Sequence, residues 1–598
     1  RDEDAAIVAD VTHVRVQKSG LSSRFHQFAV RIFSDRGVEA YRQFQMSWSP
    51  DRQEVQVLKA RITKSDGSIV NSFSESDRNL NEPWSGMYYD ARSKILTFPT
   101  LAVGDLLEIQ WRIDDTSIDN LLSDYWGDVR LVQDTLRKRL FRMVVDMPVS
   151  RPLYWNISSL PDWIKVTQSG VNDRMIYRFE ARDVERVLPE PQMPGWAEIA
   201  TPLHLSTYQN WDQVGRYYWG LVRDQLTAPD EVRRTTERVL QQIDRKNTEK
   251  VVSAIYNFVV SNTRYVALEF GIHGYKPYRV DRVLERRFGD CKDKASLIHA
   301  MLKVANVPSN LVLLRMRHLG VLTQEVASLA AFNHAIVYVP KLDLFLDGTA
   351  EFHGSRELPS ADRLANVLIV TPDGSSQFLT TPEALPRDNT SKLSMEISLQ
   401  TDGSARMRGS LAVIGQAAPE LRRAYETPAT RAATFEQQWA TPYPGISASA
   451  VTFSDPKALD SPAQLGFEAK LPRFSESGSH SLRFLPFGSA RTYAQALAPL
   501  TTRRTDLLLS GVWVNELRAT YTLPEGWSVE SLPDDFFEDS VFGTLSVRAK
   551  RVASSVVFEG TFTLKQSRIS ANEYPAFRAF LNRVDQSFGR KIVATHLF

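Results

Sequence analysis

The sequence predicts a multidomain α+β protein with a β-rich region at each end and a mixed region of helices and strands between them. Three observations predict this fold class. Apolar and polar residues alternate near both ends, helical periodicity is concentrated in the middle, and proline-containing stretches separate the three regions. A chain of 598 residues is also long enough for several domains. We therefore expect three domains, over residues 1–190, 205–365 and 385–598.

The N-terminal region is predicted to be a β domain. Residues 28–32 and 107–113 alternate between apolar and polar side chains, with the period of a half-buried strand. Asp66-Gly67 lies between two apolar runs and is typical of a hairpin turn. Several strands with turns between them indicate a sandwich or a barrel. Three prolines within residues 189–194 mark the expected end of this domain.

The middle region is predicted to be an α+β domain. Residues 229–245 begin with a proline and two acidic residues, which suits the N-terminus of a helix. Residues 248–261 carry one apolar stripe and are predicted to form a second helix. Residues 311–314 and 334–347 are predicted to be a strand and a β-hairpin.

The C-terminal region is predicted to be a β-sandwich-like domain with a closing helix. Residues 393–399, 407–413, 517–523 and 556–564 are apolar with polar alternates, as in half-buried strands. Residues 571–588 place five large apolar side chains on one face of a helix.

Composition and motifs exclude several classes of protein. A formal net charge of +2 provides no strong field for nucleic acid or for an anionic membrane, so we expect no nucleic-acid partner. No apolar run approaches the ~20 residues of a transmembrane helix, so we expect no transmembrane segment. The sequence has no His-Glu-x-x-His motif, no paired cysteines and no Asp-x-Asp-x-Asp-Gly loop. We therefore expect neither a metal nor a cofactor.

The chain contains a single cysteine, Cys291. It has no partner for an intramolecular disulfide, and no second thiol to resolve an oxidised sulfur, which argues against a redox role. A nearly thiol-free protein suits an oxidising compartment. The sequence begins Arg-Asp-Glu-Asp without a visible signal peptide. We expect a periplasmic or secreted protein.

The residues around Cys291 predict that it begins a helix. Gly289 allows a tight turn, Asp290 is a favourable N-cap, and Asp293 occupies the position of a capping-box acid. Helical spacing then continues until Pro308. The positive end of a helix favours the thiolate, although the two aspartates oppose this effect. The alternative is a buried cysteine that fills space, but the charged neighbours on both sides do not suit a core position.

A nucleophilic cysteine needs a base and a residue that orients the base. A turn at Pro340-Lys341 would place Ile336 opposite Phe345 and His334 opposite Asp347. Cross-strand neighbours have Cβ atoms ~5 Å apart, close enough for a carboxylate to hold an imidazole. Taken singly, His334 could also be a structural histidine, and Asp347 could cap the Asp-Gly-Thr turn.

The order Cys291, His334, Asp347 resembles the transglutaminase-like superfamily of papain-fold cysteine enzymes. That fold places the cysteine at the start of a helix and the other two residues on adjacent strands. Residues 289–295 and 265–271 are similar to one bacterial branch, in which the core follows an N-terminal domain of unknown function and precedes a β-rich domain. The resemblance implies a papain-like Cys-His-Asp catalytic triad.

The resemblance also implies roles for these residues. Cys291 would attack an amide or acyl carbonyl, His334 would move the proton, and Asp347 would hold the imidazole. The backbone N–H of Cys291 could stabilise the oxyanion, with a second donor upstream. Tyr265 is our candidate and Tyr275 the second choice, although both could be packing residues.

His273 lies in a glycine-containing loop, where it could line a substrate cleft or simply face solvent.

These features predict thiol-dependent acyl chemistry on a peptide or protein amide through a thioester. We favour hydrolysis over cross-linking, because no amine-acceptor pocket is evident. Two other functions stay open. One is a non-catalytic scaffold that binds a cell-envelope protein partner, and the other is acyl transfer from a thioester donor.

Overall fold

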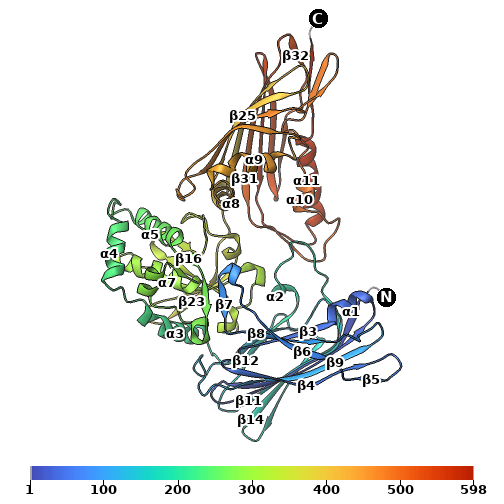
Figure 1. Ribbon diagram of the computed structural model, residues 1–598, viewed down its shortest axis with the longest axis vertical. Coiled ribbons are helices and arrows are strands. Elements are labelled where there is room, and N and C mark those ends of the chain that lie inside the picture. Colours follow the sequence, from blue (N-terminus) through green and yellow to red (C-terminus); the bar gives the residue numbers. More distant parts are fainter. Residues whose placement is uncertain (1–2, 597–598) are drawn as a thin grey trace.

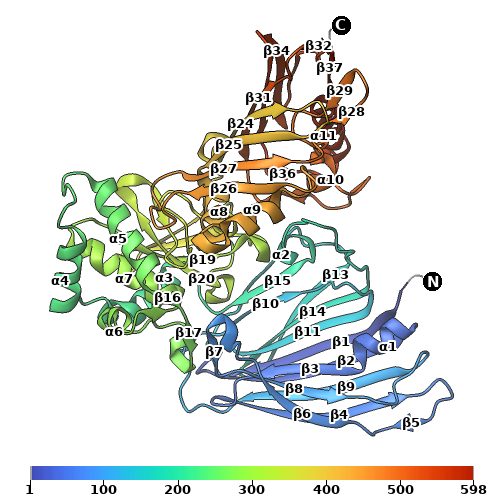
Figure 2. The ribbon, with the colours of Figure 1, turned by 45° about the horizontal axis from the view of Figure 1, so that its top comes forward.

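The computed structural model describes residues 3–596, and three parts follow one another along the chain (Figures 1 and 2). The predicted first and last domains also include residues 1–2 and 597–598, which lie outside this range. β-Sheets dominate both ends, and an α+β core lies between them. This arrangement confirms the predicted fold class. Within residues 3–596, no helix is both long enough and apolar enough to cross a membrane.

The N-terminal part is built on one eight-stranded sheet with two smaller sheets packed against it. The small sheets cover different halves of the large sheet, because each contributes buried side chains to a separate core. The large sheet has the order β13 (Ile164–Val171), β14 (Arg174–Val184), β11 (Lys138–Pro148), β1 (Ala5–Val16), β2 (Ser22–Ile32), β9 (Leu106–Asp115), β4 (Gln53–Thr63) and β5 (Ile69–Val70). One small sheet has the order β3 (Gln43–Trp48), β8 (Arg92–Thr97) and β6 (Ser74–Asn79). The other has the order β10 (Gly127–Leu131), β15 (Pro202–Ser206) and β12 (Tyr154–Ile157).

The core part packs helices against one face of a five-stranded antiparallel sheet. Helix α7 (Cys291–Val304) contacts strand β20 (His334–Val339) and helix α5 (Thr248–Asn262). The other helices are α3 (Trp211–Val222), α4 (Asp230–Val239) and α6 (Val280–Arg286). The sheet has the order β21 (Leu344–Leu346), β20, β19 (Asn310–Arg315), β22 (Asn366–Val370) and β23 (Ser376–Thr380).

Strand pairing moves two of the expected domain boundaries. Strand β15 pairs with β10 and β12 of the N-terminal part, although we expected that domain to end at 190. Strands β22 and β23 extend the core sheet beyond the expected end at 365. Strands β15 and β22 pair with strands far away in sequence, which local periodicity does not reveal, whereas β23 forms a hairpin with β22.

The C-terminal part is a β-sandwich-like domain in which two sheets and helix α11 (Tyr574–Phe588) share one core. The five apolar side chains that predicted the closing helix are all buried. We did not predict the strand β37 (Ile592–His596) that follows it. The eight-stranded sheet has the order β26 (Ser447–Phe453), β27 (Ala463–Leu471), β25 (Ala405–Val413), β24 (Thr390–Leu399), β31 (Trp513–Thr522), β35 (Ser555–Leu564), β34 (Gly543–Val552) and β33 (Phe536–Asp539). The four-stranded sheet has the order β28 (Glu476–Ser477), β29 (Ser481–Phe484), β37 (Ile592–His596) and β32 (Trp527–Ser531).

One strand of the N-terminal part pairs with the core (Figures 1 and 2). Strand β7 (Met87–Tyr89) runs parallel to β17 (Ala267–Glu269), and the N–H of Ala267 donates to the carbonyl of Gly86 at 2.6 Å. Gly86 has φ 71°, and a Cβ there would lie 2.9 Å from the carbonyl oxygen of Tyr265. A glycine is therefore needed for the two backbones to approach this closely.

A buried arginine joins the C-terminal part to the core. Arg422, on helix α8 (Ala418–Ala424), has a side chain only 1% exposed. Its guanidinium donates to the Glu357 carboxylate at 2.6 Å and 3.2 Å, and to the carbonyl of Phe352 at 2.7 Å. It also donates to the carbonyls of Leu459 and Ser461 at 3.1 Å and 3.0 Å. Arg422 thus fixes the chain segment that follows the core hairpin.

We predict that Arg422→Ala lowers the free energy of unfolding by ~3–5 kcal/mol, because it leaves the Glu357 carboxylate buried without its partner. Chemical denaturation measures this loss. The matched control is Arg408→Ala, which removes an exposed pair with Glu396 and should cost under ~1 kcal/mol. Equal losses in the two variants would contradict the proposed importance of the buried contact.

Candidate active site

The candidate nucleophile is the first residue of α7. The Asp290 carboxylate accepts a hydrogen bond from the N–H of Asp293 at 3.2 Å, and the Asp293 carboxylate accepts one from the N–H of Asp290 at 3.1 Å. These reciprocal bonds confirm the predicted capping box. At this position the N–H of Cys291 has no acceptor within the helix, and the helix dipole favours a thiolate. The thiol itself is partly exposed.

A buried cation lies beside the thiol. The Lys292 ammonium pairs with the Asp290 carboxylate and lies 4.0 Å from Oε1 of Glu269. Burial alone would lower the pKa of Lys292, but the charges of Asp290, Cys291 and Glu269 raise it overall. Burial and the charge of Asp290 also raise the pKa of Asp293 to about 6. Lys292 thus offsets the negative charges that we expected to oppose a thiolate.

The hairpin that carries His334 has a different register from the predicted one. Val337 pairs with Leu346 and Tyr338 with Phe345, a shift of two residues. The shift arises at the turn, which is a 3-10 turn over Pro340–Leu342 followed by Asp343 in the left-handed conformation (φ 46°). Because side chains in a strand repeat every two residues, this shift leaves His334 on the same face as the residue that follows β21.

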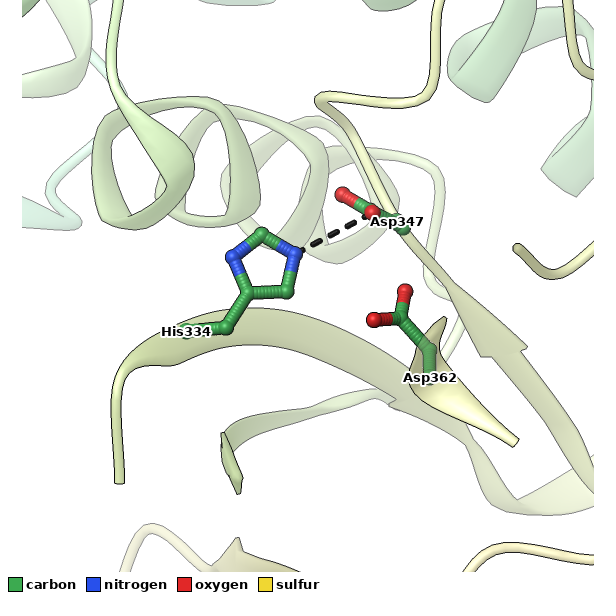
Figure 3. A group of neighbouring side chains, drawn as sticks. All are labelled: His334, Asp347 and Asp362. Carbon is green, nitrogen blue, oxygen red and sulfur yellow. Dashed lines mark ion pairs between the residues drawn. The ribbon is translucent and has the colours of Figure 1, made fainter. Parts of the chain in front are cut away.

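That residue is Asp347, and it contacts His334 (Figure 3). Nε2 of the imidazole lies 3.1 Å from Oδ2 of the carboxylate, within ion-pair range but outside the geometry of a hydrogen bond. Burial would lower the pKa of His334, but the charge of Asp347 and contacts with Asp347 and Cys291 raise it well above 6.5. The ion pair with Asp347 therefore favours the imidazolium form of His334. With Nε2 directed to Asp347, Nδ1 is the nitrogen left for the thiol.

Further contacts hold Asp347 in place. Its Oδ1 accepts hydrogen bonds from the backbone N–H and the hydroxyl of Thr349 at 2.8 Å and 2.7 Å. The hydroxyl of Tyr256 donates to the Asp347 carbonyl at 3.0 Å. A Cβ at Gly348 would lie 3.1 Å from Cβ of Lys294 on α7, so the turn fits closely against the helix. The carboxyl is fully buried, yet the charge of His334 lowers its pKa well below the ordinary range.

The structure adds Asp362, which we did not predict from the sequence. It ends the short 3-10 helix η7 (Ser360–Asp362), and its carboxyl is directed toward His334 and Asp347 (Figure 3). Polar atoms of the three residues all lie within 4.8 Å of one another. Asp362 is 0% exposed, and burial together with the charge of Asp347 raises its pKa well above 3.8. No local motif surrounds Asp362 that could have indicated this role.

Among residues 3–596, His334, Asp347 and Asp362 form the one group of three or more His, Cys, Asp or Glu side chains that lie close enough to share a metal ion. Within this group, Nε2 of His334 is directed at the Asp347 carboxylate, so the histidine and this acid are already partners of each other. The arrangement fits proton transfer instead.

Two tyrosines lie near the thiol. Tyr265 pairs with Gly289 between strands β16 (Arg264–Tyr265) and β18 (Phe288–Gly289), two residues before Cys291. Burial and the negative charge of a Cys291 thiolate raise the pKa of Tyr265, and the same two causes raise that of Tyr218 on α3. Both phenols are thus neutral O–H donors. Tyr265, our candidate for the second oxyanion donor, thus lies near the thiol, and the structure adds Tyr218 beside it.

The other two candidates interact elsewhere. The His273 ring stacks on Tyr278 with centroids 3.9 Å apart, and its Nδ1 lies 3.0 Å from the carbonyl of Lys276. Burial raises the pKa of Tyr275, and its charged neighbours are Arg52 and Glu269. The contacts of His273 and the charged neighbours of Tyr275 do not include Cys291, whereas the charge of Cys291 acts on Tyr265.

The N-terminal part reaches the edge of the site. Tyr89 on β7 lies opposite Glu269 on β17, whose carboxylate is also the distant partner of Lys292. Burial and the charges of Glu82 and Glu269 raise the pKa of Tyr89. A segment from outside the core thus lines the region next to the thiol.

Family models match all three parts of the chain. Residues 18–187 match a domain of unknown function, DUF3857, and residues 481–594 match another, DUF3858. Residues 234–339 match the transglutaminase-like superfamily, and this range contains Cys291 and His334.

Solved structures resemble the chain to very different extents. A crystal structure of a candidate protease from Parabacteroides distasonis covers 99% of both chains with a TM-score of 0.71 and 14% identity. A candidate cysteine protease from Cytophaga hutchinsonii covers 43% of this chain and 84% of its own, with a TM-score of 0.19 and 12% identity. An M1 zinc metallopeptidase from Deinococcus radiodurans covers 34% and 42%, with a TM-score of 0.20 and 11% identity.

No curated protein matches the sequence. The similarity to the Parabacteroides structure is one of fold, and it extends over the full three-part architecture. The chain therefore has a core that matches the transglutaminase-like superfamily, between an N-terminal region that matches DUF3857 and a C-terminal region that matches DUF3858.

Proposed function

We propose that this protein is a cysteine hydrolase that cleaves a peptide or protein amide through a thioester at Cys291. The observation that carries the proposal is the cluster of Cys291 at a helix N-terminus, the His334 imidazolium and the buried Asp347 carboxylate. A thiol, a base and an orienting acid in contact are the components of nucleophilic catalysis by cysteine.

The first half of the proposed reaction forms the thioester. The Cys291 thiolate attacks the amide carbonyl carbon, and a carbon–sulfur bond forms. His334 then transfers its proton from Nδ1 to the leaving nitrogen, and the amine departs. Asp347 keeps the ring oriented and stabilises its positive charge throughout.

The second half releases the acid. His334, now neutral, accepts a proton from water, and the resulting hydroxide attacks the thioester. The carbon–sulfur bond breaks, and the thiolate and imidazolium are regenerated. An amine in place of water would give transfer, with the same steps up to the thioester. We favour hydrolysis because the thiol is open to solvent and water is always present.

Two donors are proposed for the oxyanion. One is the backbone N–H of Cys291, which has no acceptor within α7. The other is the hydroxyl of Tyr265, which stays protonated because burial and the thiolate raise its pKa. Tyr89 and Glu269 at the edge of the site are proposed to contact the substrate chain.

We predict that His334→Ala strongly reduces labelling of Cys291 by a thiol-directed probe at pH 7, because the imidazolium no longer stabilises the thiolate. The single cysteine makes the labelled site unambiguous. His318→Ala, which changes an exposed histidine, is the control. Undiminished labelling of His334→Ala would instead favour a non-catalytic scaffold. If labelling is lost in His334→Ala, mass spectrometry of a trapped acyl-Cys291 identifies the acyl group that the site accepts.

We predict an alkaline limb of the pH–activity profile above pH 6.5, because the Asp347 charge raises the pKa of His334 above that value. Asp347→Asn removes this charge, so the imidazolium is lost at lower pH, and the limb should move down by about one unit or more. Hydrolysis of peptide p-nitroanilides measures the profile. Asp343→Asn, on the same hairpin but exposed, should leave the limb unmoved. If the alkaline limb stays at the same pH in Asp347→Asn as well as in Asp343→Asn, the result would argue against the His334–Asp347 ion pair.

We predict that Tyr265→Phe lowers kcat about a hundredfold with little change in KM, because an oxyanion donor acts on the transition state. Tyr275→Phe is the matched control and should change kcat by less than about threefold. The same loss in both variants, or a loss confined to KM, would contradict the assignment of Tyr265.

A further inference from the structure

Asp362 is a buried carboxyl that the proposed reaction does not yet use. It lies behind the His334–Asp347 pair, on η7 between the core hairpin and β22, and faces both residues (Figure 3). Neither of its oxygens accepts a hydrogen bond from any residue within 3–596. A fully buried carboxylate without a donor is strongly disfavoured. The neutral acid, in contrast, has an acceptor close by in Asp347, because an oxygen of each carboxyl group lies within 4.8 Å of the other.

We propose that Asp362 is a positioning residue, held as a neutral carboxylic acid that donates its proton to the Asp347 carboxylate. Asp347 then remains the single negative charge directed at Nε2 of His334. This inference rests on the proposed function, because the pair that it positions is the proposed base and its orienting acid.

The charged groups around Asp362 do not offer an alternative partner. His334 is already paired with Asp347. Arg363, the next residue, directs its Nε to the carbonyl of Leu358 at 3.3 Å. Helix η4 (Arg317–Leu319) packs against η7, but Arg317 donates to the carbonyl of Leu509 at 3.0 Å.

The groups that face Asp347 from α5 and α7 are also engaged. The hydroxyl of Tyr256 on α5 bonds to the Asp347 carbonyl, and the ammonium of Lys294 on α7 donates to the carbonyl of Thr263 at 2.6 Å. No cation in the described part of the chain forms an ion pair or a hydrogen bond with Asp362, although the charges of His334 and Arg363 act against the rise in its pKa.

The neutral state matters for the acid step. His334 must give its proton to the leaving amine, and each negative charge beside the ring makes the imidazolium a weaker acid. An ionised Asp362 would add a second carboxylate to a ring that already faces one. A protonated Asp362 avoids this and restrains Asp347 through its hydrogen bond. It thus limits how strongly the site holds the proton that the reaction must release.

Infrared difference spectroscopy tests the protonation state without a substrate. At pH 7, the spectrum of the wild type minus that of Asp362→Asn should contain the C=O stretch of a protonated carboxyl. The ultraviolet absorbance of the Cys291 thiolate gives a second measurement, because the chain has no other thiol. Because Asp362→Asn replaces a neutral acid by a neutral amide, the titration of the Cys291 thiolate should stay at the same pH. A missing C=O band, or a titration that Asp362→Asn shifts to lower pH, would show an ionised Asp362 and overturn the proposal.

Alkylation of Cys291 tests the positioning role. Asp362→Ala removes the hydrogen bond that restrains Asp347, so Asp347 orients the His334 ring less well toward Cys291 and alkylation at pH 6 should slow about tenfold. Asp362→Asn, which keeps a neutral donor, should restore the wild-type rate. An unchanged rate in Asp362→Ala would overturn the role. A wild type that passes these tests but hydrolyses no amide would contradict the proposed function and leave the role of Asp362 intact.

Discussion

The packing of α7 against β20 is the constraint on which the candidate site depends. The thiol comes from the first turn of a helix, whereas the imidazole comes from the start of a strand that is distant in sequence. Neither residue is useful alone, since the helix terminus only favours a thiolate and the strand only presents a ring. The close fit of Gly348 against Lys294 adds the carboxylate to the same contact. The chemistry therefore follows from one helix–sheet interface.

The sequence was informative where the determinants of structure are local. The capping box at Asp290 and the helical start at Cys291 follow from neighbouring residues, and both occur in the structure. The apolar face of the last helix is predictable for the same reason. The hairpin register was wrong by two residues, because a 3-10 turn ending at Asp343 replaced the expected two-residue turn. The side chains of the hairpin still lie on the predicted faces, because side chains in a strand alternate between the two faces and a shift of two residues restores the same face.

Non-local features were not predictable. Asp362 enters the site from a three-residue helix with no pattern around it, and only the folded chain brings it to Asp347. Strand β7 pairs with a core strand far along the sequence, and β15 returns to the N-terminal sheet after the expected boundary. These placements depend on tertiary contacts between segments that show no sign of one another in the sequence.

The two flanking domains contact the core close to its reactive residues. Strand β7 pairs with β17, which begins two residues after Tyr265, and Arg422 binds the segment that follows Asp347. The second contact has a consequence for the order in which the protein is made. A chain synthesised from its N-terminus acquires Cys291 and His334 long before α8 exists, and domains fold as they emerge. The segment behind Asp347 therefore gains its contacts with Arg422 only after α8 has been made, later than the core contacts that hold Asp347 itself.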